Sequence, residues 1–214
     1  MPAELLTAKG RQTRQAIEQA ARKLFAERGF HGTTLAEITS AAGKSSAVFY
    51  RYFADKEDLL AALAESFLHD VVAPSGLSLH LPDSPPQAGG TPTDDDNFFN
   101  AVVTGYWNIF KQNIGIMIAV AQLAATQQRF AAVQNEFRLF GMNIVAASVR
   151  RAQEQGYGTE LNPQHTAAAI ALLFENFTTV FVGPSGPAGL GLEISDEDAI
   201  ATLSTVWKKT LYGA

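Results

Sequence analysis

The sequence predicts an all-α protein. Apolar residues recur at the spacing of a helix face in several segments. The first segment runs from about Arg11 to Arg28, and Gly29 then provides a stop. Its one-sided apolar stripe consists of Ile17, Ala20, Ala21, Leu24 and Phe25. Hydrophobic residues make up 47% of the 214 residues, which is enough for a folded core in one or two domains.

The next stretch, residues 33–53, predicts two short helices joined by a tight turn. Thr34 suits a helix N-cap, and Glu37 three residues later completes a capping box, in which each side chain binds a free amide of the other residue. Gly43 can adopt the left-handed conformation that ends a helix, and Ser45 is a new N-cap. A helix, a glycine turn and a second helix form the helix-turn-helix pattern.

The second of these helices carries the side chains that a DNA-reading helix needs. Phe49 lies four residues before Phe53, so the two rings anchor one side of the helix. The residues at its start, Ser45 to Ala47, are small enough to enter a major groove, and the tyrosines that follow offer hydroxyls to the DNA backbone.

The net charge of −5 conceals an asymmetry between the two parts of the chain. Residues 1–53 contain eight basic and four acidic residues, a net charge of +4, whereas residues 54–214 contain eight basic and seventeen acidic residues, a net charge of −9. A DNA-binding domain joined to an acidic body has this distribution, and chance clustering on a solvated face is the alternative.

Taken in order, the motifs of residues 11–65 resemble the DNA-binding domain of the TetR (tetracycline-repressor) family. The pieces that carry the resemblance lie within residues 16–30, 33–43, 45–53 and 55–60. Lys44, where the family mostly has a small apolar residue, and Thr39, where alanine is usual, depart from the pattern. The resemblance implies that Lys56 and the start of its helix bind a phosphate. The expected DNA-binding residues are Thr34, Lys44, Ser45, Ser46, Ala47, Tyr50, Tyr52 and Lys56.

We therefore expect a helix-turn-helix DNA-binding domain over residues 1–53 and a helical ligand-binding and dimerisation domain over residues 54–214. Asp55 suits the N-cap of the helix that links them. Residues 74–96 are rich in proline and glycine and predict a loop or mobile insert that ends in Asp94, Asp95 and Asp96. Three adjacent carboxylates lack the alternating spacing of a calcium loop, so we interpret them as helix caps.

Two or three helices are expected between residues 96 and 155, and the first of them is aromatic. Polar Gln122 and Asn143 fall among apolar residues, and an apolar pocket with a few polar groups is the usual form of a small-molecule site. Core packing is the more common role for any single residue here. The candidates for the ligand pocket are Phe99, Tyr106, Trp107, Phe110, Met117, Gln122, Phe137, Phe140, Asn143, Phe174 and Phe177.

Two further helices close the chain. Asn162 is a cap followed by Pro163 at the first helical position, and Ser195 begins the last helix. Both helices carry apolar faces, which an isolated subunit would leave exposed. By the same resemblance, this pair of helices forms a homodimer through a four-helix bundle.

Several classes of function are excluded or disfavoured. The chain has no cysteine, shows no nucleophile–base motif and has scattered histidines, so we expect no enzyme activity, no metal and no cofactor. The start has no signal-peptide pattern, and the apolar run near residues 114–123 is too short to cross a membrane, so a cytoplasmic location is expected. Together with the patterns above, the resemblance to the TetR family implies a homodimeric repressor that binds an operator in double-stranded DNA and responds to a small apolar ligand. A helical carrier of hydrophobic ligands is the alternative.

Overall fold

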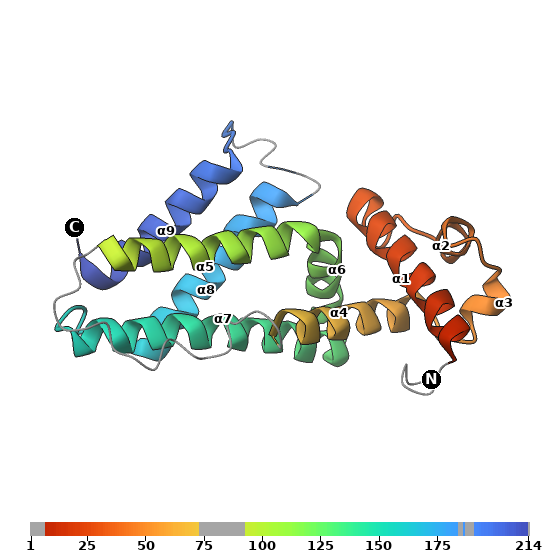
Figure 1. Ribbon diagram of the computed structural model, residues 1–214, viewed down its shortest axis with the longest axis horizontal. Coiled ribbons are helices and arrows are strands. Elements are labelled where there is room, and N and C mark those ends of the chain that lie inside the picture. The colour runs from red at the N-terminus through yellow and green to blue at the C-terminus, as the bar shows by residue number, and fades with distance from the viewer. Residues whose placement is uncertain (1–6, 73–92, 184–185, 187–190, 214) are drawn as a thin grey trace. The chain divides into compact units, whose positions relative to one another are not determined.

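The computed structural model describes residues 7–72, 93–183, 186 and 191–213. Within these residues the chain forms nine helices and no strand, so the predicted all-α class is confirmed. Figure 1 labels the helices along the chain. They are α1 (Ala8–Arg28), α2 (Leu35–Ala41), α3 (Ser46–Phe49), α4 (Lys56–Val72), α5 (Thr93–Gln112), α6 (Ile114–Ala124), α7 (Gln128–Glu154), α8 (Pro163–Val182) and α9 (Asp196–Tyr212).

The helices group into two compact units. The N-terminal unit comprises the described residues of 1–69 and 113–134, and the C-terminal unit comprises those of 70–112 and 135–214. Helix α7 contributes to both. The N-terminal unit therefore includes most of α4 and all of α6, whereas the expected division fell after residue 53; that division of the chain into domains stays a prediction.

Helix α1 forms the longest element of the N-terminal unit. The Thr7 hydroxyl accepts a hydrogen bond from the Gly10 amide, so the helix starts one turn earlier than the sequence predicts. It ends where Gly29 takes φ = 70°, a conformation that glycine adopts without a steric cost. Ile17, Ala21 and Phe25 are fully buried, which confirms the predicted apolar face.

The caps and the glycine turn of α2 and α3 are those that the sequence predicts, but α3 is shorter than predicted. Thr34 and Glu37 form the complete capping box, Gly43 has φ = 64°, and Ser45 caps α3 by accepting from the Val48 amide. The regular helix α3 is only four residues long, whereas the sequence favoured a helix up to Phe53. After Phe49 the chain continues as turns, in which some amides reach back three residues instead of four.

Helix α4 begins as the sequence predicts. The Asp55 carboxylate accepts a 2.7 Å hydrogen bond from the Asp58 amide, and Asp58 in turn accepts from the Ala54 amide at 3.0 Å. Residues 74–92 of the predicted loop lie outside the described residues. Thr93 to Asp96 are helical, so this end of the predicted loop is wrong: these residues form the first turn of α5.

Helix α6 packs against the end of α1 with almost no space between the two backbones. A Cβ atom on Gly115 would lie 2.5 Å from the Phe25 carbonyl carbon and 2.5 Å from the Ala26 amide nitrogen. Just before α6, the Asn113 side-chain oxygen accepts a 2.9 Å hydrogen bond from Arg22. A glycine is thus required where these two helices approach.

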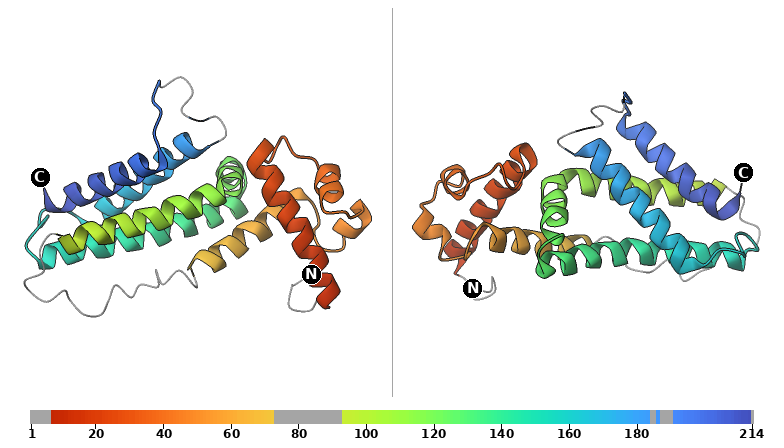
Figure 2. Two further views of the ribbon diagram at one scale, coloured as in Figure 1. Left: turned by 45° about the horizontal axis from the view of Figure 1, so that its top comes forward. Right: turned by 180° about the vertical axis from the view of Figure 1, so that it is seen from behind.

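The C-terminal unit consists of helices packed around an aromatic core. Helices α5 and α9 pack against each other, and α7 and α8 supply the remaining walls (Figure 2). Trp207 is buried at the centre, and its indole donates to the Ser148 hydroxyl at 3.1 Å. The Trp107 indole donates to Asp196, which also binds Lys111 at 2.6 Å.

Helix α8 leaves much of its apolar surface exposed in the single chain. Its buried stripe is Ala167, Ile170, Phe174 and Thr178, whereas Leu172 and Leu173 are more than 40% exposed. By length and composition alone α8 could cross a membrane, but one such helix by itself is weak evidence of a membrane span. Glu175 within it binds Arg138 of α7 through two hydrogen bonds of 2.7 and 2.8 Å, and its buried stripe packs into the core, as in a helix of a globular protein.

Candidate nucleic-acid interface

The start of α3 presents a continuous exposed surface. Ser45, Ser46 and Ala47 are exposed, and Tyr50 one turn later is 60% exposed. The sequence placed all four residues near DNA, and the structure brings them together on one face of the N-terminal unit. Small side chains at the start and a projecting phenol beyond them give a surface that base edges and phosphates can approach.

Phe49 and the turn before α3 hold this surface in place. Phe49 is fully buried, and its ring lies 5.5 Å from that of Phe53 and 5.7 Å from that of Tyr50. Because the Tyr50 ring packs at a right angle against a buried ring, its direction is restrained although the side chain is exposed. The Lys44 amide donates to the Thr39 carbonyl at 2.8 Å, which fixes the turn while the Lys44 side chain remains half exposed.

Thr34 has a structural role that limits its role toward DNA. Its hydroxyl accepts from the Glu37 amide at 3.2 Å and contacts Glu37 Oε2 at 2.8 Å, so the capping box already uses its hydrogen-bonding groups. These bonds from Thr34, and secondarily Arg28 at 2.8 Å, hold the pKa of the Glu37 carboxyl below its usual value. A contact from Thr34 to phosphate remains a prediction.

The structure corrects the expected direction of Lys56. The resemblance implies that Lys56 binds a phosphate, but Lys56 Nζ donates to the carbonyl oxygens of Phe30 and Thr33, both at 2.7 Å. It also lies 4.2 Å from the centre of the Phe30 ring. Tyr52 is half-buried rather than exposed. Sequence reasoning did not identify Thr33 or Arg28 as partners in this corner, because neither has a motif of its own.

Comparison with known proteins supports this assignment of the fold. Residues 17–63 match the sequence profile of bacterial regulatory proteins of the tetR family. The N-terminal unit thus carries a TetR-family DNA-binding sequence over these residues. The chain is 40% identical over 68 residues to the transcriptional repressor AcnR of Corynebacterium glutamicum, an alignment that covers 30% of this chain and 36% of AcnR. The matched stretch thus spans about a third of the length of that relative.

Two longer matches extend over the C-terminal unit. The transcriptional regulator EthR of Mycobacterium tuberculosis is 24% identical over 199 residues, which is 92% of this chain and 86% of EthR. The structure of FadR from Bacillus subtilis, determined in complex with stearoyl-CoA, superposes with a TM-score of 0.63 at 17% identity and covers 94% of this chain and 98% of FadR. AcnR, EthR and FadR are regulators or repressors, in agreement with the prediction that this chain is not an enzyme.

Five of the eleven predicted pocket residues belong to the aromatic core of the C-terminal unit or pack against it. Phe99, Trp107 and Phe174 are members of the buried cluster, Tyr106 and Phe177 pack against it, and Phe110 is buried at the end of α5. The next two, Phe137 and Phe140 on α7, are half-buried. A last candidate, Met117, lies on α6 in the N-terminal unit.

Two polar candidates do not lie where the sequence suggested. Gln122 and Asn143 are exposed, so the expectation that they sit in apolar surroundings is wrong. Each follows the helical period onto the outer side, because the buried residues Leu123 and Val145 are one and two positions away. The burial of these two residues therefore depends on the helix face they occupy and not on the polarity of their neighbours in the sequence.

The polar groups that the core does contain were not all predicted. The hydroxyls of Tyr106 on α5 and Thr178 on α8 are enclosed, and among the described residues neither has a hydrogen-bond partner of acceptable geometry. Burial raises the pKa of the Tyr106 phenol far above its usual 10, and the Thr178 hydroxyl beside it opposes that shift. Thr178 continues the buried stripe of Ile170 and Phe174, which is the signal that could have identified it.

Proposed function

We propose that this TetR-family protein is a homodimeric transcriptional repressor that binds a pseudo-palindromic operator and is released from it by a small apolar molecule. The observation that carries the proposal is the exposed row of Ser45, Ser46, Ala47 and Tyr50 on a helix-turn-helix whose sequence matches the family. AcnR, which resembles the N-terminal unit, is named as a repressor, and this supports repression over activation. A cytoplasmic location follows from a role on DNA.

The DNA contacts are assigned by position. Ser45, Ser46 and Ala47 lie nearest the base edges, Tyr50 and Lys44 contact phosphates, and half-buried Tyr52 and capping Thr34 support them at the backbone. Two copies would present α3 to successive major grooves, about 34–36 Å apart.

The exposed face of α8 supports a homodimer formed through α8 and α9. Leu172, Leu173 and Val180 on α8 and Val206 on α9 are 38–43% exposed in one chain, and a second copy would remove them from water. Leu173→Glu should therefore give a monomer in analytical ultracentrifugation. Tyr50→Glu, an equally disruptive change on the other unit, should remain dimeric. A monomeric wild type at micromolar concentration would refute the dimer.

The core of the C-terminal unit supports an apolar effector that carries one polar group. Around Tyr106 the described side chains are largely aromatic. The phenol is neutral at physiological pH even at its usual pKa of 10, and burial raises that pKa further. A neutral phenol can donate a hydrogen bond, so an acceptor on the ligand, such as a carbonyl or an ether oxygen, fits this place. FadR, a relative in fold, was crystallised with stearoyl-CoA, a ligand with a long apolar chain.

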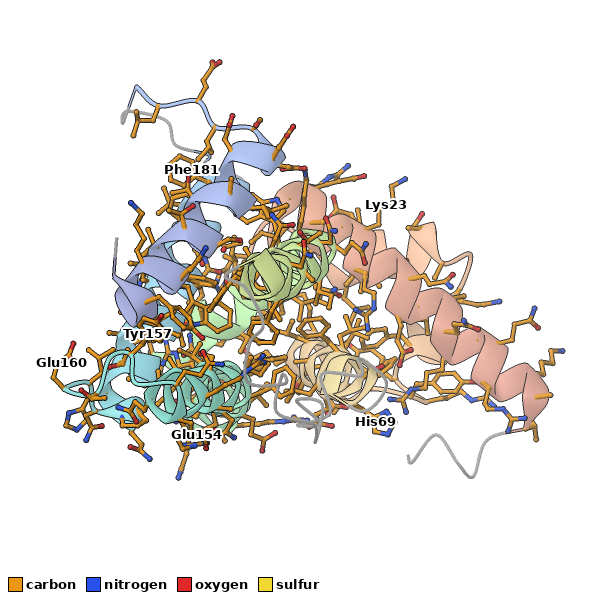
Figure 3. The ribbon with its side chains drawn as sticks, turned by 60° about the vertical axis from the view of Figure 1, so that its left-hand side comes forward. Lys23, His69, Glu154, Tyr157, Glu160 and Phe181 are labelled. Carbon is orange, nitrogen blue, oxygen red and sulfur yellow. The ribbon has the colours of Figure 1, made fainter. Side chains whose placement is uncertain are left out.

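The test is selection of DNA by the full chain from a random duplex library, followed by fluorescence anisotropy on the enriched sequence. We expect an inverted repeat to be enriched. Tyr50→Ala should lower its affinity about tenfold, since a contact to the backbone is lost. The matched control is Tyr157→Ala, because Tyr157, labelled in Figure 3, is also about half exposed but lies in the C-terminal unit. Equal affinities for both variants would refute the assigned interface.

A carrier of hydrophobic ligands remains the second candidate, since the aromatic core alone would serve either role. The two functions differ in the selection experiment: a carrier enriches no duplex sequence at low salt, whereas a repressor does.

A further inference from the structure

The corner between α1 and α2 is held by one side chain from α4. Lys56 is the first residue of α4, and its ammonium group donates to the Phe30 and Thr33 carbonyl oxygens at 2.7 Å each. Phe30 follows the end of α1, and Thr33 directly precedes the N-cap of α2. The contact thus joins the start of α4 to the segment where the chain enters the helix-turn-helix.

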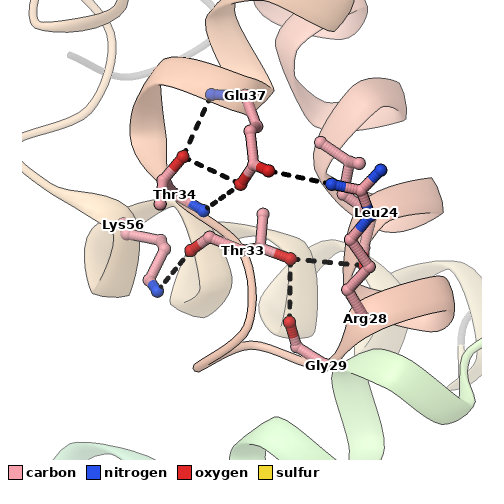
Figure 4. A network of polar contacts seen from close by, with 7 residues as sticks. All are labelled: Leu24, Arg28, Gly29, Thr33, Thr34, Glu37 and Lys56. Carbon is pink, nitrogen blue, oxygen red and sulfur yellow. Dashed lines mark hydrogen bonds and ion pairs between the residues drawn. The ribbon is translucent and has the colours of Figure 1, made fainter.

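Thr33, whose carbonyl is one of the two that Lys56 binds, belongs to a connected network, shown in Figure 4. The Thr33 hydroxyl donates to the Gly29 carbonyl at 2.8 Å and contacts the Leu24 carbonyl at 3.3 Å, and Thr33 is almost completely buried. The next residue, Thr34, forms the capping box with Glu37. If the Lys56 ammonium group moved, Thr33 would move with it and would displace the adjacent N-cap residue Thr34, and with it the first turn of α2.

The chemistry of this contact favours a structural link between α4 and the α1–α2 corner over an ammonium group that is free to bind a DNA phosphate. Two of the three ammonium hydrogens are already donated, and the Phe30 ring covers the cation at 4.2 Å. Charge-assisted hydrogen bonds to backbone carbonyls are among the stronger ones in proteins. The partial burial of the ammonium group lowers the pKa of Lys56 from its usual value, and the nearby Glu57 carboxylate opposes this shift.

We propose that Lys56 is a positioning residue: it sets the orientation of α2 and α3 relative to α4, and it does not neutralise a DNA phosphate. The role as a determinant of DNA affinity rests on the proposed function, but the mechanical link does not. Because the family resemblance implies a phosphate contact at this position, the two accounts make opposite predictions for the salt dependence of binding.

The first experiment needs no DNA. Amide hydrogen exchange is measured on the full-length protein for Lys56→Met, which keeps the length of the side chain and removes the cation. The Glu37 and Ile38 amides, which donate to Thr34, should exchange at least tenfold faster than in the wild type. Lys56→Arg should restore much of the protection. The control is Lys23→Met, since Lys23 is 76% exposed on α1 (Figure 3). Unchanged exchange in Lys56→Met, or equal acceleration in the control, would overturn the proposal.

The second experiment measures the affinity for the selected operator at several salt concentrations. Each phosphate contact contributes about 0.9 to the slope of log K against log salt concentration. We expect Lys56→Met to bind at least tenfold more weakly with an unchanged slope, whereas a slope smaller by about 0.9 would overturn the proposal. If the wild type binds no duplex, the proposed function fails and hydrogen exchange alone decides the inference.

A wild-type measurement covers the case in which Lys56→Met does not fold. The ammonium group of Lys56 is followed by ¹⁵N NMR, with nuclear Overhauser contacts to the Phe30 ring as the readout. The contacts should persist when operator DNA is added. Their loss on binding would show that the ammonium group leaves the corner, and would overturn the proposal.

Discussion

The approach of α6 to α1 gives a prediction of stability with a magnitude. In Gly115→Ala the new Cβ would lie 2.5 Å from two backbone atoms of α1, about 1 Å short of the ~3.5 Å at which carbon atoms attract each other. No side-chain rotation can relieve a contact between two backbones, so α6 itself must move. Overpacking of this kind typically costs about 1–3 kcal/mol. The gain in helix propensity from glycine to alanine, up to about 1 kcal/mol, offsets part of it.

The assay is thermal and urea unfolding of Gly115→Ala beside Gly141→Ala. Gly141 is also helical, but a Cβ there has no atom within 4 Å, so alanine should stabilise by roughly 0.5–1 kcal/mol. Since 1 kcal/mol changes the melting temperature of a chain of this size by about 2–4 °C, the two variants should move in opposite directions. A Gly115→Ala protein as stable as Gly141→Ala would refute the close approach of α1 and α6.

Three further predictions concern the C-terminal unit. Thr178→Val should be neutral or stabilising by up to about 1 kcal/mol in urea unfolding, because a methyl group replaces an enclosed hydroxyl that has no satisfactory partner among the described residues; a clear loss of stability would show that the hydroxyl is bonded. Glu175→Gln should destabilise by about 1–2 kcal/mol, since it breaks the paired contacts with partly exposed Arg138, and Glu136→Gln on exposed α7 surface should have no effect. Lys111, and then Trp107, hold the pKa of Asp196 below its usual 3.8. The stabilisation from Asp196 is therefore complete above that value and is lost as the pH falls through the lower folded pKa, so Asp196→Asn should flatten the acid side of the stability curve; identical curves would count against the contact.

The features that the sequence predicted correctly are local ones. Thr34, Ser45, Asn162 and Ser195 each cap a helix as expected, because an N-cap depends on a side chain and an amide two or three residues away. Gly43 adopts the left-handed conformation for a similarly local reason. These signals located the helix-turn-helix and therefore the candidate interface.

The features that the sequence missed depend on distant parts of the chain. Lys56 turns inward to bind carbonyl oxygens that lie more than twenty residues earlier in the sequence. No spacing rule connects residues so far apart, so the contact could not be predicted. Gly115 resembled an ordinary glycine within an apolar run, and only its approach to Phe25 shows why a side chain is not tolerated. Gln122 was assigned to a pocket from its neighbours in sequence, although the helix turns it outward.

The same distinction explains the length of α3. Phe49 and Phe53 are spaced for a continuous helix, and their rings do meet at 5.5 Å. The intervening amides of Arg51 and Tyr52 nevertheless bond three residues back, to Val48 and Phe49, which tightens the turn before α4. Spacing fixed the contact between the rings, but it did not determine the conformation of the backbone between them.

The most direct measurement of the central account is a hydroxyl-radical footprint of the full-length protein on its selected operator. If two copies place the exposed residues of α3 in successive major grooves, two protected stretches will appear about one helical turn apart, related by the symmetry of the site, and Tyr50→Ala will weaken both together. A single protected stretch, or protection unaffected by Tyr50→Ala, would contradict the account.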